Sequence, residues 1–193
     1  MTPDWEAAID TAAAIADIPA AATITGTFPA GVVHAAGERL PSARPRYLPF
    51  QRYPLREHAG LLVEAARKLY PDVPMRMALR RVGRGAPDTL LQSMLGRVVL
   101  GSVEGSVAIV QAVARSYALH LQPGSMEVLS CVSDAGRTEM ILHARDVHHF
   151  LETHHVGVFE GVLRFASVRE GEVTVKVLSR GEAQLRCRFR SLT

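Results

Sequence analysis

The sequence predicts an α+β fold, in which an N-terminal helical part packs on a four-stranded antiparallel sheet. As far as residue 121, apolar residues recur with helical spacing, whereas after Pro123 the period of the pattern becomes two. The strand-like segments form two pairs on either side of one apolar helix, and helices kept apart from antiparallel strands are typical of this class. We therefore expect one domain over residues 1–193, with a mainly helical part over 1–121 and a β-hairpin, a helix and a second β-hairpin over 122–193.

The first fifty residues predict short elements. Residues 4–17 are rich in alanine and predict a helix, and the β-branched stretch 22–28 predicts a short strand. A further helix is expected over 29–40, because Pro29 suits a first helical turn. The proline-rich stretch 40–54 predicts an irregular connection.

The middle of the chain has clearer helical periodicity. Apolar stripes at i, i+4 and i+7 mark its helices, and Pro71 follows the end of the first. Gly83 and Gly85 are expected to end the second helix. The helices are expected over residues 55–69, 75–82, 87–100 and 103–121.

Alternating segments predict two hairpins in the last third of the chain. The strands are expected over residues 125–134, 137–145, 172–180 and 182–190. In the final strand, Leu185 and Phe189 should face the core and Arg186 and Arg188 the solvent, because successive side chains of a strand point to opposite faces. The helix after residue 155 should cover the apolar face of the resulting sheet.

The composition limits the class of protein. The chain has 193 residues, a net charge of +3 and 48% hydrophobic residues, which fits a soluble globular protein. So small a charge does not predict nucleic-acid binding, and charged or proline residues interrupt each apolar stretch, so we expect no membrane span. Cys131 and Cys187 form neither a metal-type spacing nor a disulfide framework, which favours a cytoplasmic protein.

Four of the eight histidines lie in residues 146–157, which read DVHHFLETHHVG. On one continuous helix His148 and His155 would share a face, but no pair has the i, i+4 spacing with which two imidazoles grip one ion. We therefore interpret the segment as a helix junction with solvated histidines and a break near 153–155, and expect neither a metal nor another cofactor. The less favoured alternatives are a metal site, with Asp146 and Glu152 as further ligands, and a pH switch.

An arginine stripe precedes this segment. Arg76, Arg80 and Arg84 lie on one face of the expected helix and could hold an anion or an acidic partner. No aromatic residues alternate with them, which disfavours single-stranded nucleic acid. The alternative interpretation is the solvated face of an amphipathic helix.

The helix that follows the histidines is the candidate wall of a ligand-binding or docking site. Two glycines at i, i+4 suggest that the sheet, another helix or a ligand approaches this helix closely. Glu160 could bind a ligand amine or an arginine, and the apolar members of the wall could equally be plain core. The candidate wall consists of Gly157, Val158, Phe159, Glu160, Gly161, Val162 and Phe165.

Two resemblances follow from these residues. The run HHVGVFEGVLRF (154–165), with LYPDVP (69–74) and RRVGRGAPDTLLQSMLGRVV (80–99), resembles a family of paralogous, largely uncharacterised proteins of myxobacteria. The order strand–strand–helix–strand–strand more distantly resembles the haem–nitric-oxide-binding domain and the related four-vinyl-reductase type of ligand-binding domain. That likeness implies a helical subdomain on a four-stranded antiparallel sheet with a pocket between them, and sensing rather than catalysis.

The resemblance does not extend to the cofactor signatures. In the haem-binding members, a Tyr-x-Ser-x-Arg motif grips the haem propionates, and here the corresponding stretch reads LHARDVHH (142–149). Zinc-binding relatives of the four-vinyl-reductase type use cysteines, of which this chain has two. The resemblance therefore implies the fold without haem.

Three hypotheses about function remain open. The leading one is a non-enzymatic, cytoplasmic regulatory or sensory module that binds a small apolar ligand or a protein partner. The second is a structural or scaffolding homo-oligomer with a filled core, and the third is a metal-dependent enzyme using the cluster from His148 to His155. A cavity of roughly several hundred cubic ångströms between sheet and helix would favour the first, a large apolar dimer surface the second, and stoichiometric metal the third.

Overall fold

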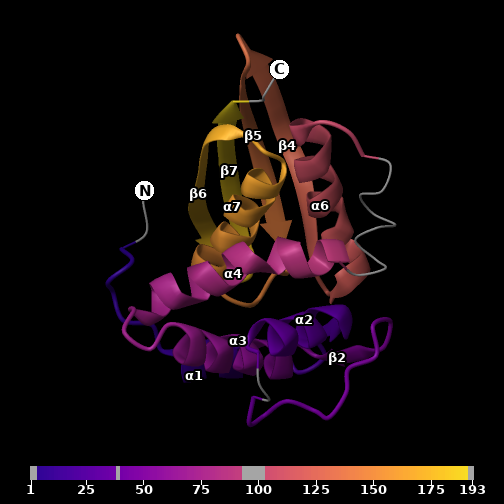
Figure 1. The fold of residues 1–193 in the computed structure, drawn as a ribbon, viewed down its shortest axis with the longest axis vertical. Coiled ribbons are helices and arrows are strands. Elements are labelled where there is room, and N and C mark those ends of the chain that lie inside the picture. Colours follow the sequence, from indigo (N-terminus) through magenta and orange to yellow (C-terminus); the bar gives the residue numbers. More distant parts are fainter. Residues whose placement is uncertain (1–3, 38–39, 93–102, 191–193) are drawn as a thin grey trace.

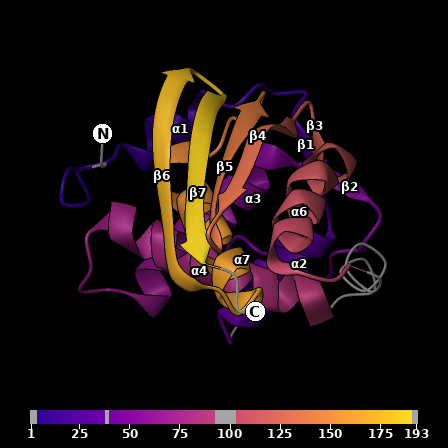
Figure 2. The ribbon, with the colours of Figure 1, turned by 90° about the horizontal axis from the view of Figure 1, so that it is seen from above.

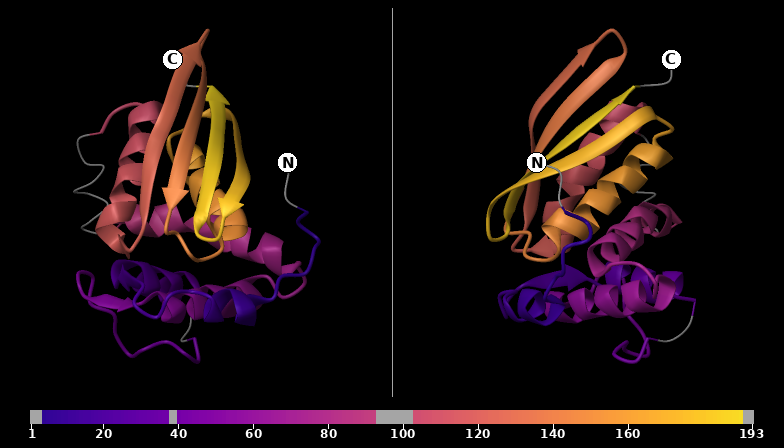
Figure 3. Two further views of the ribbon diagram at one scale, coloured as in Figure 1. Left: turned by 180° about the vertical axis from the view of Figure 1, so that it is seen from behind. Right: turned by 90° about the vertical axis from the view of Figure 1, so that its left-hand side faces the viewer.

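The computed structural model describes residues 4–37, 40–92 and 103–190. Helices α1 to α3 and a small sheet form one layer, and a four-stranded sheet with two helices forms the other (Figure 1). Helix α4 (Met75–Gln92) crosses between the two layers and packs on α3 (Leu55–Leu69) from one and on α7 (Val156–Phe165) from the other (Figure 3). The α+β class and the helical part packed against a four-stranded antiparallel sheet are thereby confirmed.

The first layer is built from short elements. They are α1 (Thr11–Ala16), β1 (Thr23–Thr25), α2 (Thr27–Ala35), β2 (Arg52–Pro54) and α3 (Leu55–Leu69). Helix α1 is shorter than predicted because it begins after Asp10, whose carboxylate accepts a hydrogen bond from the Ala13 N–H. Strand β1 pairs with β2 and with β3 (Leu121–Gln122), a sheet that the sequence did not predict because strands so short leave no periodic pattern.

Helix α4 (Met75–Gln92) corrects the prediction that Gly83 and Gly85 end a helix. The helix continues through both glycines and through Pro87, so its pattern of apolar residues outweighs their weak helix propensity. The backbone of the histidine segment lies against Gly83, where a side chain would collide with the carbonyl of His154. The part of the predicted helix 87–100 beyond residue 92 lies outside the described residues.

The second layer contains the four-stranded sheet. Its strands are β4 (Ser125–Asp134), β5 (Arg137–Arg145), β6 (Arg169–Ser179) and β7 (Glu182–Arg190), in the antiparallel order β4-β5-β7-β6 (Figure 2). In β7, Leu185 and Phe189 are buried while Arg186 and Arg188 are exposed, as the alternating pattern predicted. Both predicted hairpins are therefore confirmed.

One face of the sheet carries two helices. Helix α6 (Ser106–His120) packs along β4, and α7 (Val156–Phe165) packs on β6 and β7 at the other edge of the sheet (Figures 1 and 2). The view from behind shows that none of the helices in the described ranges covers the opposite face (Figure 3). That face is charged. On it, Arg188 of β7 donates a hydrogen bond to Glu139 of the adjacent strand β5 at 2.7 Å. In the described part of the chain, no helix is both long and apolar enough to cross a membrane.

Candidate functional site

A small cavity lies where helices of both layers meet. It has a volume of about 60 Å³, and α3, α4, α6, α7 and the histidine segment contribute most of its lining. The lining is largely apolar, with Phe28, Val113 and Val158 among its members, and histidines supply most of its polar atoms. A single water molecule needs about 10–15 Å³, so the cavity has room for a ligand of a few heavy atoms. The cavity lies between helices, and not between the sheet and a helix as expected.

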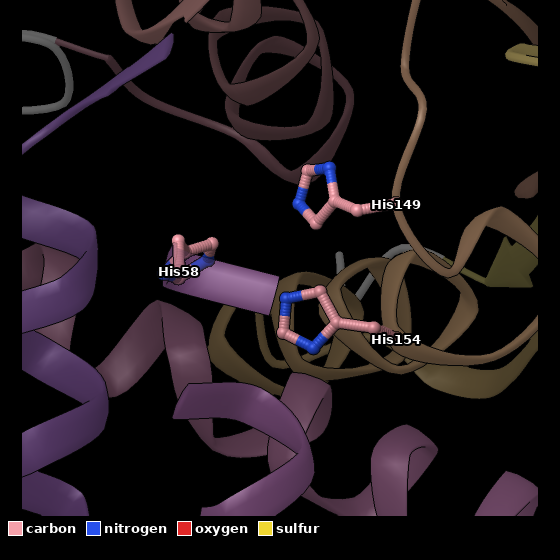
Figure 4. A group of neighbouring side chains, drawn as sticks. All are labelled: His58, His149 and His154. Carbon is pink, nitrogen blue, oxygen red and sulfur yellow. The ribbon is translucent and has the colours of Figure 1, made fainter. Parts of the chain in front are cut away.

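Three histidines beside the cavity form a compact group. His58 comes from α3, His149 from the loop after β5, and His154 from a π-helical turn (Leu151–His155) that leads into α7. Each ring offers one nitrogen, and these nitrogens all lie within 4.8 Å of one another. Figure 4 shows the three rings arranged around a common space. The fold therefore brings together residues that are about ninety positions apart in the sequence.

Burial keeps these rings uncharged. Burial lowers the pKa of His58 to about 3 and that of His154 to about 4. The pKa of His149 is also lowered well below its usual range, first by burial and then by the neighbouring histidines. A neutral imidazole has one nitrogen that carries a proton and one that has a free lone pair. Each of the three rings therefore keeps a lone pair that could bind a metal ion.

The buried rings are poorly satisfied by hydrogen bonds. The Nδ1 atoms of His58, His149 and His154 have no hydrogen-bond partner among the residues that the structure describes. In His155 the Nδ1 atom lies 2.8 Å from the Tyr117 hydroxyl, and it is the Nε2 atom that has no partner among the described residues. Buried polar atoms are normally paired, so an unpaired cluster at a cavity points to a ligand or ion.

The backbone of the histidine segment is unusual. Asp146 has φ 56° and Phe150 has φ 49°, and the left-handed region is uncommon for residues other than glycine and an outlier for a bulky one. A π-helical turn then follows where the sequence predicted a helix break near 153–155. Such strain and π-helical turns cluster at functional sites.

The sequence predicted that these histidines are solvated, and this prediction was wrong. His149, His154 and His155 are 3–5% exposed, because the loop after β5 and the π-helical turn that follows it direct them into the junction between the layers. His148 points elsewhere and lies against Gly181, so it does not share a face with His155. The pair singled out as the metal alternative, His148 and His155, is thus not the pair that the fold brings together.

The candidate wall on α7 divides into two faces. Val158, Val162 and Phe165 line the cavity. Phe159 is fully buried and stacks on Tyr117, with 6.1 Å between the ring centres. The other members face α4, where a side chain at Gly157 would meet the carbonyl of Arg80, and one at Gly161 that of Arg84. Another helix is therefore what approaches the two glycines.

The arginine stripe is not an open anion patch, which corrects that expectation. Arg80 and Arg84 both donate hydrogen bonds to the Glu160 carboxylate, and Arg76 donates one to Glu152 at 3.2 Å. Burial alone would raise the pKa of Glu160, but the hydrogen bonds from Arg80 and Arg84 outweigh it and lower the pKa. The stripe is paired because α4 packs directly on α7, which carries Glu160, and on the π-helical turn, which carries Glu152.

The sequence interpretation missed two buried histidines of the site. His58 lies on α3 between Leu55 and Leu62, within the buried stripe that predicted this helix. His120 ends α6 and lines the same cavity. A histidine on an apolar helical stripe is the signal that could have found His58, but only the fold shows that it meets His149 and His154.

Solved H-NOX domains share this fold. An oxygen-binding H-NOX domain related to soluble guanylate cyclases matches with a TM-score of 0.55 and 13% identity, covering 87% of this chain and 93% of that one. An H-NOX protein from S. oneidensis in the Fe(II)NO ligation state matches with a TM-score of 0.58 and 10% identity, covering 86% and 99%. The Fe(II) state of a triple mutant of that protein matches with a TM-score of 0.60 and 11% identity, covering 86% and 96%. At such identities the likeness shows the fold alone.

The chain belongs to the family DUF2378, described as a protein of unknown function, whose model matches residues 24–190. No match was found among curated proteins. The expected membership of an uncharacterised family and the distant likeness to the haem–nitric-oxide-binding fold are both confirmed. An origin in myxobacteria stays a prediction.

The residues around the cavity do not fit a haem. A drug-sized ligand fills a pocket of about 300–1,000 Å³, whereas this cavity measures about 60 Å³. The space between the helices is instead taken up by the close crossing of α4 and α7, where the backbones meet at Gly83 and Gly157. The function of the histidine cluster must therefore be inferred from the chemistry of its own side chains and not from haem binding.

Proposed function

We propose that the protein is a non-enzymatic sensory or regulatory module that binds a small apolar ligand in the cavity between α6 and α7. The observation that carries this proposal is the position of the cavity, which both layers of the molecule line. Its apolar walls favour an apolar occupant, and its volume of about 60 Å³ limits that occupant to a few heavy atoms. The H-NOX fold supports the proposal, since solved members of this fold are an oxygen complex and an Fe(II)NO state.

A ligand at this place can act on the rest of the molecule. Helix α6 lines the cavity on one side and packs on β4 on the other. An occupant that fits one position of α6 better than another shifts the population of the two positions by its difference in affinity. The sheet would then transmit occupancy to a partner.

The second candidate function is docking of a protein partner or of a second copy of the chain. Leu129 and Val132 on edge strand β4 are 49% and 64% exposed. Exposed apolar side chains on an edge strand suit pairing with another chain. We therefore propose that a second copy of the chain or a partner protein binds this edge of the sheet and responds to its conformation. We also propose the cytoplasm as the location, which the two free cysteines support.

Xenon, a small apolar probe, tests the proposed function. The full chain, labelled with ¹⁵N, is exposed to xenon pressure while its amide resonances are recorded. We expect shifts at Val113 and Val158 beside the cavity, and further shifts in the β4–β5 hairpin, which does not touch the cavity. Shifts confined to the cavity would contradict a sensory role, and no shifts would contradict ligand binding.

A pair of matched variants controls for nonspecific binding. Val113→Ile adds one methylene that reduces the cavity, whereas Val110→Ile adds the same group to the same helix away from the lining. Val113→Ile should weaken the xenon response and Val110→Ile should retain it. Equal responses would place the xenon elsewhere.

A further inference from the structure

We propose that His58, His149 and His154 form a binding site for a divalent transition-metal ion, with one coordination position open to the cavity. The metal site rests on the geometry of the three rings. The assignment of the open position to the sensed ligand rests in addition on the proposed function.

The distances allow one ion to reach all three rings. A tetrahedral zinc ion with nitrogen ligands at about 2.0–2.1 Å places those nitrogens about 3.3 Å apart. The nitrogens offered here lie within 4.8 Å of one another, so small rotations of the rings bring them to an ion. The π-helical turn and the loop before it present His149 and His154 on one side, and the rigid helix α3 presents His58 on the other (Figure 4).

The state of the rings favours coordination. All three are 2–5% exposed, and their unpaired Nδ1 atoms carry the penalty of burying a polar group without a partner. An ion that accepts their lone pairs removes that penalty.

The ligand set selects the kind of ion. Imidazole nitrogens suit zinc, copper, iron and nickel, whereas magnesium and calcium need oxygen ligands. Among the described residues, the group contains no carboxylate and the cavity lining contains none either. Three histidines with an open fourth position form the arrangement of metal sites that bind an exchangeable ligand.

The fourth position faces the space where the proposed ligand lies. His58, His149 and His154 all belong to the lining of the cavity, so a small molecule there is in reach of the ion. His155 packs edge-on against His149, with 4.5 Å between the ring centres, and its Nδ1 is held by the Tyr117 hydroxyl. We assign His155 and Tyr117 as positioning residues for His149.

Zinc titration of the full chain tests the site. Protein freed of metal by a chelator is titrated with Zn²⁺ in a calorimeter. One ion should bind per chain, and His58→Gln, His149→Gln or His154→Gln should weaken binding about a hundredfold or more. His148→Gln is the matched control, because this histidine lies outside the group, and its binding should equal that of the wild type.

Cobalt gives a measurement that needs no variant. Co²⁺ bound by three imidazoles and one further ligand in a tetrahedral site gives intense visible bands, and azide at the open position should shift them. If the wild type binds no Zn²⁺, shows only the weak bands of octahedral Co²⁺, or loses binding through His148→Gln, the metal site is refuted.

The metal and ligand proposals fail separately. Xenon shifts in a chain that binds no Zn²⁺ or Co²⁺ would remove the metal site and leave the apolar ligand site. Stoichiometric metal in a chain whose sheet responds to neither xenon nor azide would remove the sensory role and leave the metal site.

Discussion

Buried histidines are the most unusual residues of this protein, since six of its eight histidines are buried. His120 is the best suited to measurement, because it lies outside the proposed metal ligands and its Nδ1 is 3.4 Å from the Thr25 hydroxyl. Burial, and secondarily the charge of Arg52, lowers the pKa of His120 to about 4. The folded protein thus holds this ring neutral at a pH where the unfolded chain protonates it.

The lowered pKa of His120 should make the stability of the folded protein depend on pH. A folded pKa below the unfolded value of about 6.5 makes the unfolded state bind more protons, so stability is full above pH 6.5 and falls as the pH drops toward 4. Between pH 7 and pH 5, His120 alone should remove about 2 kcal/mol of unfolding free energy. Urea unfolding of the wild type and of His120→Gln at both pH values measures the difference. An equal loss in both proteins would contradict the prediction.

Glu160 should matter more for stability than the other paired acid facing α4. Its side chain is 14% exposed and accepts from two guanidinium groups, whereas that of Glu152 is 47% exposed and accepts from one. Glu160→Gln leaves Arg80 and Arg84 short of a counter-charge and should cost about 2–3 kcal/mol. Glu152→Gln should cost less than about 0.5 kcal/mol, because exposed ion pairs contribute little. Equal losses on denaturant unfolding would show that Arg80 and Arg84 find other partners.

At the level of secondary-structure elements, the close crossing of α4 and α7 depends on glycine residues. A Cβ at Gly83 would collide with the carbonyl of His154, whereas a Cβ at Gly85 on the same helix meets nothing within 4 Å. The two glycines thus have opposite roles in one helix: the first allows close packing, and the second only weakens the helix.

Alanine at each position should separate these roles. Gly83→Ala should destabilise by about 1–3 kcal/mol through overpacking, and Gly85→Ala should stabilise by up to about 1 kcal/mol through helix propensity. Melting temperatures of the two variants give the signs directly. Stabilisation by Gly83→Ala would mean that the helices can move apart without loss. Gly83→Ala should also weaken zinc binding, since it displaces the backbone that carries His154.

The whole molecule should unfold as one unit, because α4 is packed between its two layers. Trp5 is the only tryptophan, and its ring lies 4.1 Å from the Arg80 guanidinium, so its fluorescence reports on the first layer and α4. Far-ultraviolet circular dichroism reports on all elements together. The two signals should show the same midpoint in urea. An earlier transition in fluorescence would divide the chain into two domains, against the prediction of one.

The sequence by itself determined the α+β class and most of the longer elements. Periods of 3.6 and 2 identified α3, α6 and the four strands of the large sheet, because burial of one face leaves a local, repeating pattern. The same alternation placed Leu185 and Phe189 inside and Arg186 outside. The glycine pair on α7 also predicted that another element approaches this helix closely, although the sequence did not show that this element is α4.

Only the tertiary structure decided the site. The meeting of His58 with His149 and His154 depends on how α3, α4 and α7 pack, and contacts between residues so far apart in sequence leave no period in it. In the same packing, arginines that were predicted to form an anion patch form ion pairs with Glu160. The packing also keeps α4 continuous, although local propensity would end this helix at Gly83. Local preferences amount to about 1 kcal/mol per residue, whereas burying an apolar side chain contributes about 1.5–3 kcal/mol. Where the two disagreed, tertiary burial decided the structure.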